Sequence, residues 1–283
     1  MKSPLIKIII GMAGLIILLP ACAGPANMVQ DNLTQGNILS QSGKPADAAA
    51  ENNSASAAPA ADAGTTQMPA ADDFDRAVEA GTAALAASPD DVALKEKLAD
   101  AYIARAWYYK SKRLNPYTVT DLFKAIEIDP KYYRAHYELG RFHNNQWQFG
   151  IAIYDLNIAI SLKPDFAPAY SERAYSYYKN QKFEAGLADA DKALELDSTN
   201  AQFYCTRSLI YAATGKPDLA LEDANKAVQI TPSDAFSFYN RSLVYTAAGK
   251  PDLAMADLET TLKLSQDDLL TTRARADLQK LQR

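Results

Sequence analysis

Residues 215–220 read GKPDLA, and residues 249–254 read GKPDLA again, 34 positions later. The same spacing recurs in residues outside this hexapeptide. Three series follow it: Pro130, Pro164, Ser198, Pro232 and Gln266; Ile126, Ile160, Leu194, Val228 and Leu262; and Ile128, Leu162, Leu196, Ile230 and Leu264. A period of this length marks stacked supersecondary units, each of which cannot bury its apolar face alone. The hexapeptide therefore belongs to a repeating scaffold rather than to a duplicated active-site loop.

Each unit can be divided into two helices. In the unit 133–166, numbered so that Pro164 is position 32, Leu139 and Gly140 stand at positions 7 and 8, and Ala152 and Ala159 at positions 20 and 27. This pattern resembles the tetratricopeptide repeat, a helix-turn-helix unit of the same length. The resemblance implies an all-α fold, a right-handed superhelical solenoid of antiparallel helix pairs.

The repeated hexapeptide contains two signals for the turn inside a unit. Gly215 and Gly249 can end a first helix in a left-handed backbone conformation. Pro217 and Pro251 can stand in the first turn of the second helix. The hexapeptide is therefore expected at the turn between the two helices of a repeat.

The spacing predicts a solenoid over residues 73–283. It divides into a lone helix at 73–91, repeats at 92–132, 133–166, 167–200, 201–234 and 235–268, and a closing helix at 269–283. The repeat 92–132 is irregular, because Pro89 and Pro130 are 41 residues apart, seven more than the period. We place the extra residues near YYKSKRLNPY (residues 108–117), between the two helices.

The N-terminal part of the chain has a different composition. Residues 24–72 contain no aromatic residue and Lys44 as their only base, which predicts a disordered tether. Before it, MKSPLIK gives a basic start and IIIGMAGLIILL a short apolar core, which together indicate an export signal. Leu19-Pro20-Ala21-Cys22 resembles a bacterial lipobox. This implies that Cys22 is lipidated and that the protein is a membrane-anchored lipoprotein, in the outer membrane if the source is Gram-negative.

Two other interpretations of the N-terminus stay open. Ala21-Cys22-Ala23 also fits a small-residue cleavage site, which would release a soluble periplasmic or secreted protein. The apolar segment could also persist as an uncleaved anchor. Any contact with a membrane is expected through the N-terminus rather than through the folded domain.

Net charge bears on the kind of partner, and cysteine content bears on the source of stability. The formal net charge is −5, which argues against the basic patch that nucleic-acid binding needs. After Cys22 the only cysteine is Cys205, so the mature chain has no internal disulfide to form. Stability must therefore come from helix stacking.

Catalytic and metal-binding motifs are also missing from the sequence. No G-x-S-x-G motif or phosphate-binding glycine loop occurs. His136 and His143 are seven residues apart and would share a helix face, which suits a metal ligand pair. They stand at positions 4 and 11, however, where other units carry Tyr or Phe, so we interpret them as packing residues. We predict no catalytic residue, cofactor or metal site. An exported enzyme with an unrecognised site is the alternative from another class.

The face of the first helix opposite the packing stripe offers a better candidate site. Positions 4, 7, 8 and 11 form the stripe, so positions 2, 5, 6, 9, 12 and 13 point away from it. In the family, this opposite face lines a concave groove that binds peptides or partner helices. The candidate residues are Tyr137, Arg141, Tyr175, Tyr178, Leu209, Phe236, Tyr239, Asn240 and Leu243. Aromatic and apolar residues on this face indicate a recognition surface, and the alternative is that they contact neighbouring repeats.

Charged residues also recur with the period. Position 23 carries Asp155, Asp189, Asp223 and Asp257, and position 7 carries Arg173, Arg207, Arg241 and Arg275. The separation is 16 residues within a unit and 18 between units, and both place the two groups level across an antiparallel helix pair. Because pairing between units leaves fewer end residues alone, we expect a structural ladder between repeats, in which Asp155 pairs with Arg173, Asp189 with Arg207, Asp223 with Arg241, and Asp257 with Arg275, and in which an aspartate can also touch the arginine of its own unit. The sequence as a whole predicts a non-catalytic scaffold or adaptor of the bacterial cell envelope that binds a protein or peptide. A pilus or secretion pilotin is a more specific form of this interpretation.

Overall fold

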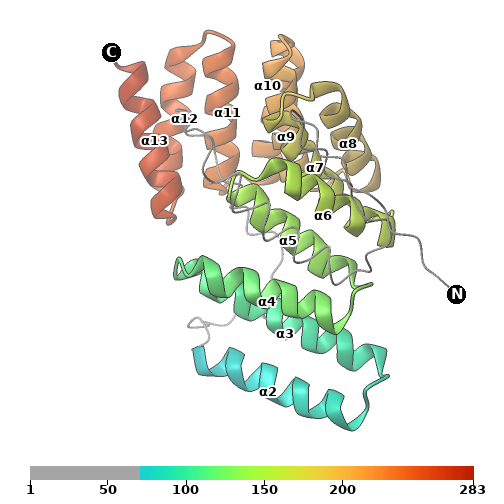
Figure 1. Cartoon of the computed structure of the whole chain (residues 1–283). Helices are drawn as coiled ribbons and strands as arrows, with labels where there is room; N and C mark the ends of the chain where they lie inside the picture. Colours follow the sequence, from blue (N-terminus) through green and yellow to red (C-terminus); the bar gives the residue numbers. More distant parts are fainter. Residues whose placement is uncertain (1–70) are drawn as a thin grey trace, which may run out of the picture. The chain divides into compact units, whose positions relative to one another are not determined.

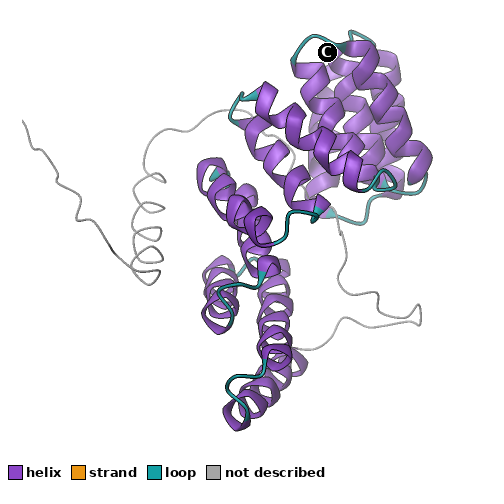
Figure 2. Cartoon of the chain, turned by 90° about the vertical axis from the view of Figure 1, so that its right-hand side faces the viewer, coloured by secondary structure: helices purple, strands orange, loops and turns teal. Residues whose placement is uncertain are grey.

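The computed structural model describes residues 71–283, which form helices joined by short turns, with no strand in that range (Figure 1, Figure 2). The helices are α2 (Ala71–Ala87), α3 (Val92–Ser111), α4 (Asn115–Ile128), α5 (Tyr133–Asn145), α6 (Phe149–Leu162), α7 (Ala167–Lys179), α8 (Phe183–Leu196), α9 (Ala201–Ala213), α10 (Pro217–Ile230), α11 (Ala235–Ala247), α12 (Pro251–Leu264) and α13 (Asp268–Leu281). The predictions for segment 1–23, with Cys22, and for the tether 24–72 lie outside the described residues, apart from Ala71 and Asp72, which begin α2.

Successive helices pack as pairs. The first and second helices of the five repeats are α3 with α4, α5 with α6, α7 with α8, α9 with α10, and α11 with α12, while α2 packs on α3 and α13 on α12. The first helices also contact one another in order, from α3 through α5, α7 and α9 to α11. They therefore form one continuous face of the stack. The predicted all-α solenoid of antiparallel helix pairs is confirmed.

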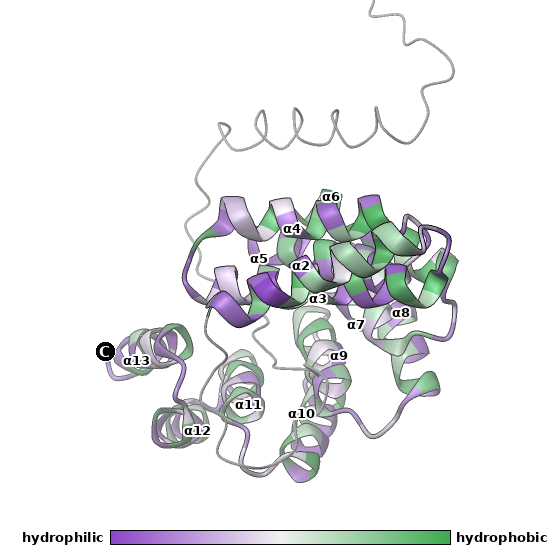
Figure 3. Cartoon of the chain, turned by 90° about the horizontal axis from the view of Figure 1, so that it is seen from below, coloured by the Kyte–Doolittle hydropathy of each residue, from purple (hydrophilic) through white to green (hydrophobic). Residues whose placement is uncertain are grey.

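The core lies between the paired helices. Leu122, Leu156 and Leu258, one from the second helix of three different repeats, are at most 1% exposed. Figure 3 shows hydrophobic and hydrophilic residues interleaved along the helices, as amphipathic elements require. Burial of each such leucine contributes about 1.5–3 kcal/mol to folding.

The repeated hexapeptide stands at the predicted turns. Gly215 and Gly249 have φ angles of +71° and +67°, in the left-handed region that glycine adopts at no steric cost. Pro217 and Pro251 are the first residues of α10 and α12, where a proline loses no helical hydrogen bond. The expected roles of these four residues are confirmed.

The seven extra residues of the first repeat do not lie between its helices, so this prediction is wrong. The turn between α3 and α4 is residues 112–114, as short as the turn 146–148 between α5 and α6. Instead α3 has 20 residues, whereas α5 has 13. Seven residues are about two helical turns, so the insertion lengthens the helix and leaves its packing face unchanged.

The predicted ion-pair ladder between repeats is also wrong. Each arginine binds the aspartate of its own repeat: Arg173 with Asp189, Arg207 with Asp223, and Arg241 with Asp257, with Nε to Oδ2 distances of 2.6, 2.7 and 2.7 Å. Asp155 instead accepts a bond from His143, and Arg275 is exposed on α13. The short turn holds the two helices of one repeat antiparallel, which places side chains 16 residues apart directly opposite each other.

The same guanidinium groups do reach the preceding repeat, at a different position. The Nη1 atoms of Arg173, Arg207 and Arg241 donate to Asn157, Asp191 and Asn225, which stand two residues after the predicted aspartates. The arginines therefore link repeats as expected. The acceptor between repeats is an exposed side chain rather than the buried carboxylate.

Candidate binding groove

A groove of about 310 Å³ opens between the first helices of the last repeats and α13. Its lining residues are Tyr175, Tyr178 and Lys179 from α7, Leu209, Ala212 and Ala213 from α9, Tyr239, Leu243 and Ala247 from α11, and Asp277 from α13. The groove is open to solvent, because Ala213 and Ala247 are exposed. Small residues at these two places leave room for a side chain from outside.

The structure gathers five of the nine predicted groove residues in this groove: Tyr175, Tyr178, Leu209, Tyr239 and Leu243. It does not bring in the other four. The Tyr137 ring packs edge-on against Phe166 at 5.0 Å, Phe236 is buried, and Asn240 donates to Ser208. Asn240 thus contacts the preceding repeat, whereas Tyr137 packs on Phe166 at the end of its own repeat.

The fourth residue, Arg141, belongs to a polar cluster on α3, α5 and α7. Its guanidinium lies 4.7 Å from the Trp107 ring and donates to Glu138 Oε2 at 2.9 Å. Its Nε is 3.8 Å from Glu172 Oε1. Burial raises the pKa of Glu172 and the positive charge of Arg141 opposes that rise. Because its buried charges face one another, this cluster suits the joining of repeats better than ligand binding.

An aromatic group forms the α7 end of the groove. Lys179 Nζ lies 5.4 Å from the ring centroids of Trp147 and Tyr178 and 5.7 Å from that of Tyr175, all within cation–π range. Trp147 is 43% exposed and has a φ angle of +63°, a strained conformation for a bulky residue. It stands in the turn before α6, where two other repeats have glycine. The equivalent turn residues Arg113, Gln181, Gly215 and Gly249 also have positive φ angles, so this conformation belongs to the turn of the repeat.

The α13 end of the groove is polar. The Tyr239 hydroxyl donates to Asp277 Oδ2 at 2.9 Å, and Lys280 Nζ donates to Asp277 Oδ1 at 2.9 Å. Arg273 lies one helical turn before Asp277. Burial, together with the positive charge of Arg273, lowers the pKa of Lys179 to about 8. The charge of Arg273 on α13 therefore reaches Lys179 at the α7 end of the groove.

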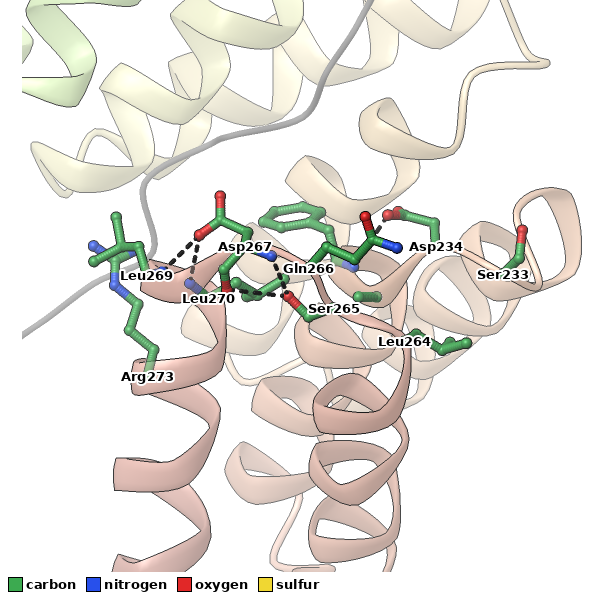
Figure 4. Close-up of a pocket in the computed structure, with 11 residues that line it drawn as sticks. Ser233, Asp234, Leu264, Ser265, Gln266, Asp267, Leu269, Leu270 and Arg273 are labelled. Atoms are coloured by element: carbon green, nitrogen blue, oxygen red, sulfur yellow. Dashed lines mark hydrogen bonds between the residues drawn. The ribbon is translucent and has the colours of Figure 1, made fainter. Parts of the chain in front are cut away.

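A second pocket, of about 250 Å³, lies at the N-terminal ends of α11 and α13 (Figure 4). Its two carboxylates are occupied by helix capping. Asp234 accepts from the backbone N–H groups of Phe236 and Ser237, and Asp267 from those of Leu269 and Leu270. Capping satisfies the orphan donors at the helix ends, which gives this pocket a structural purpose.

The two histidines are held by protein groups. His143 Nδ1 lies 2.6 Å from Asp155 Oδ2, and His136 Nε2 lies 3.0 Å from the carbonyl oxygen of Pro130. In other repeats the equivalent positions bracket an arginine, as Tyr204 and Tyr211 do with their ring centroids 6.0 and 5.6 Å from the Arg207 guanidinium. The histidines therefore take the places of packing side chains. Within residues 71–283, no three potential ligands cluster as a metal site would need.

Comparison with known proteins agrees with this architecture. The tetratricopeptide-repeat family model matches residues 201–234. Two solved structures have similar folds, each with a TM-score of 0.58. TTC0263, a thermophilic TPR protein from Thermus thermophilus, is 18% identical, and the match covers 64% of this chain and 99% of that one. The Cut9–Hcn1 hetero-tetramer of APC/C contains a chain that is 16% identical, with 75% and 40% covered.

The described part of this chain has the fold of a tetratricopeptide-repeat solenoid. This fold suggests a protein–protein interaction scaffold. No curated protein matches the sequence. No helix of the tetratricopeptide-repeat region, residues 71–283, combines the length and apolar character needed to cross a bilayer.

Sequence reasoning missed several residues in the groove lining and others beside it. Asp277 and Arg273 would have been found by continuing the repeat numbering into the closing helix, where they fall at positions 9 and 5. Trp147 could not be found from a helix face, because it lies in a turn. Ala212 and Ala247 carry no chemical signal of their own, since their contribution is the space that they leave.

Proposed function

We propose that this protein is a non-catalytic adaptor that binds a segment of a partner protein in the groove of α7, α9, α11 and α13. The observation that carries the proposal is the groove itself. Leu209, Leu243 and three tyrosines, Tyr175, Tyr178 and Tyr239, line a solvent-open space together with small alanine side chains. Tyr178 and Leu243 are half-buried and can cover an incoming apolar side chain, whereas Tyr175, Tyr239 and Leu209 are already buried and form the wall of the groove.

The volume limits what the groove can hold. About 310 Å³ is the size of a small ligand pocket and accommodates a few side chains rather than a whole domain face. Each large apolar side chain that enters would contribute about 1.5–3 kcal/mol before the cost of ordering the segment. We infer that the partner presents a short segment with two or three apolar anchors.

We further propose that the protein acts in the bacterial cell envelope, tethered by lipid on Cys22. The support is the sequence Leu19-Pro20-Ala21-Cys22 after a basic and then apolar start, followed by a polar segment that would separate the repeats from the membrane. Intact-mass analysis of the native protein tests this. A chain that begins at Cys22 and carries acyl groups is expected, and an unmodified mature chain would contradict it.

Site-specific photo-cross-linking tests the binding groove. A benzoylphenylalanine at Ala247, an exposed groove residue, should form an adduct with a partner in cells. The same probe at Leu253, which is 48% exposed on α12 and outside the groove lining, should not. Leu243→Glu should abolish the Ala247 adduct at unchanged helical content. Equal adducts at both sites, or an adduct that survives Leu243→Glu, would contradict the proposal.

A further inference from the structure

Lys179 in the groove and Arg273 beside it on α13 form no ion pair with any acidic residue in the described range 71–283. The other arginines of the last three repeats, Arg207 and Arg241 among them, each bind a buried carboxylate. Lys179 and Arg273 therefore differ from the structural cations of the stack, since neither forms an ion pair with a carboxylate of the described residues.

The surroundings of Lys179 raise the free energy of its charged form when no acidic partner is present. Its ammonium group is partly removed from water among the rings of Trp147, Tyr175 and Tyr178. The positive charge of Arg273 adds repulsion, and both effects lower the pKa of Lys179. A negative charge placed between the two cations would relieve both effects, because it would restore a partner for each.

The one carboxylate in the groove lining is already engaged. Asp277 accepts from the Tyr239 hydroxyl and from Lys280, at 2.9 Å in each case. Lys179 in the groove and Arg273 and Lys280 on α13 give three cations against the one carboxylate of the groove lining. This excess of cations makes the region positive on a chain whose formal net charge is −5. This local reversal of sign favours an acidic ligand.

The next inference rests on the proposed binding function and concerns the chemical character of the segment that binds. We propose that the groove recognises a partner segment in which an Asp or Glu side chain lies between apolar residues, with its carboxylate placed between Lys179 and Arg273. The apolar neighbours of that acid would lie on Leu209 and Leu243, over the alanine floor. A free inorganic anion would leave this apolar surface uncovered, which is why we assign the carboxylate to a peptide.

Peptide selection on the full-length protein in detergent tests this assignment. Random 12-residue peptides displayed with a fixed C-terminal extension should be enriched in an Asp or Glu flanked by Leu, Ile, Val or Phe. A selected peptide should bind at least about tenfold more tightly than its Glu→Gln form, the size of one modest charge-assisted contact. The Lys179→Met/Arg273→Met variant should bind the two peptides equally.

Controls separate this inference from folding effects. Lys226→Met, which removes an exposed lysine on α10, should keep the preference for Glu over Gln. If the double variant misfolds, Lys179→Glu serves instead and should prefer a peptide with Lys in place of Glu. Selected peptides without an acidic preference, or an unchanged preference in these variants, would overturn the carboxylate assignment and leave the groove function standing. Failure to select any peptide would overturn both.

The photo-probe at Ala247 also distinguishes a separate partner from the chain's own segment 24–70. An intramolecular adduct between a photo-probe at Ala247 and that segment, identified by mass spectrometry, would overturn the assignment to a separate partner. An adduct with another protein that contains the acidic–apolar pattern, lost in Lys179→Met/Arg273→Met, supports the assignment.

Discussion

Removal of Arg207 should destabilise the solenoid far more than removal of its exposed partner. Arg207 holds Asp223 through two bonds, from Nε at 2.7 Å and from Nη2 at 2.9 Å, and holds Asp191 through Nη1 at 2.8 Å. The side chain of Asp223 is 6% exposed, whereas that of Asp191 is 56% exposed. Arg207→Met therefore leaves one carboxylate buried without a cation and the other in water.

The burial of the two carboxylates sets the expected magnitudes. Breaking a buried pair from one side costs about 3–5 kcal/mol, and an exposed pair contributes about 0–1 kcal/mol. Because the Arg207 side chain is itself 22% exposed, water reaches part of the site, and we expect a loss near the lower end, about 3 kcal/mol. Asp191→Asn should cost less than about 1 kcal/mol.

Urea denaturation followed by circular dichroism at pH 7 measures these differences, provided that the m values of the variants agree. The ion pair lies in α9 and α10, which pack on repeats at both sides. Its removal should therefore destabilise the whole stack. Arg207→Met/Asp223→Leu should recover much of the stability, because no charge is then stranded. Equal effects of Arg207→Met and Asp191→Asn, or no recovery in the double variant, would refute the reasoning.

Three further changes test packing, backbone and charge. Gly140→Ala should destabilise by about 1–3 kcal/mol in thermal or urea unfolding, because an added Cβ would lie 2.7 Å from Leu156 Cγ. Gly215→Ala should lower the free energy of unfolding by about 1 kcal/mol, because alanine is strained at its φ of +71°. Gly150→Ala, whose added Cβ also meets no atom but which lacks a positive φ, should be neutral or stabilising. The folded pKa of Lys179, about 8, lies below its unfolded value of about 10.4, so the unfolded state holds more protons in between. Stability should therefore rise from pH 8 to 10, and Lys179→Met should lack this rise.

The fold could be predicted from the sequence because its signals are local and periodic. The turn chemistry of Gly215 and Pro217 and the spacing of apolar residues depend on neighbours along the chain, and the helix bounds follow from them. The length of α3 could not be assigned in this way. An insertion of two helical turns preserves the apolar face, so the sequence is equally compatible with a longer helix and a longer turn.

The site was only partly predictable because it depends on contacts between repeats. Position 5 is Tyr137 in one repeat and Tyr239 in another, yet the first packs on Phe166 and the second reaches a groove. The difference comes from what the following helices place opposite them. The ion-pair ladder failed for a similar reason, since separations of 16 and 18 residues are both compatible with an antiparallel pair. Only the packing of the helices selects Asp223 for Arg207.

Hydrogen exchange on the full-length protein, with and without a selected acidic–apolar peptide, tests the central claim most directly. We predict slower amide exchange in α7, α9, α11 and α13 when the peptide is bound, with little change in the second helices α4 and α6. The protection should disappear in Lys179→Met/Arg273→Met at the same peptide concentration. Protection centred on the second helices, or unchanged protection in that variant, would contradict binding in the groove.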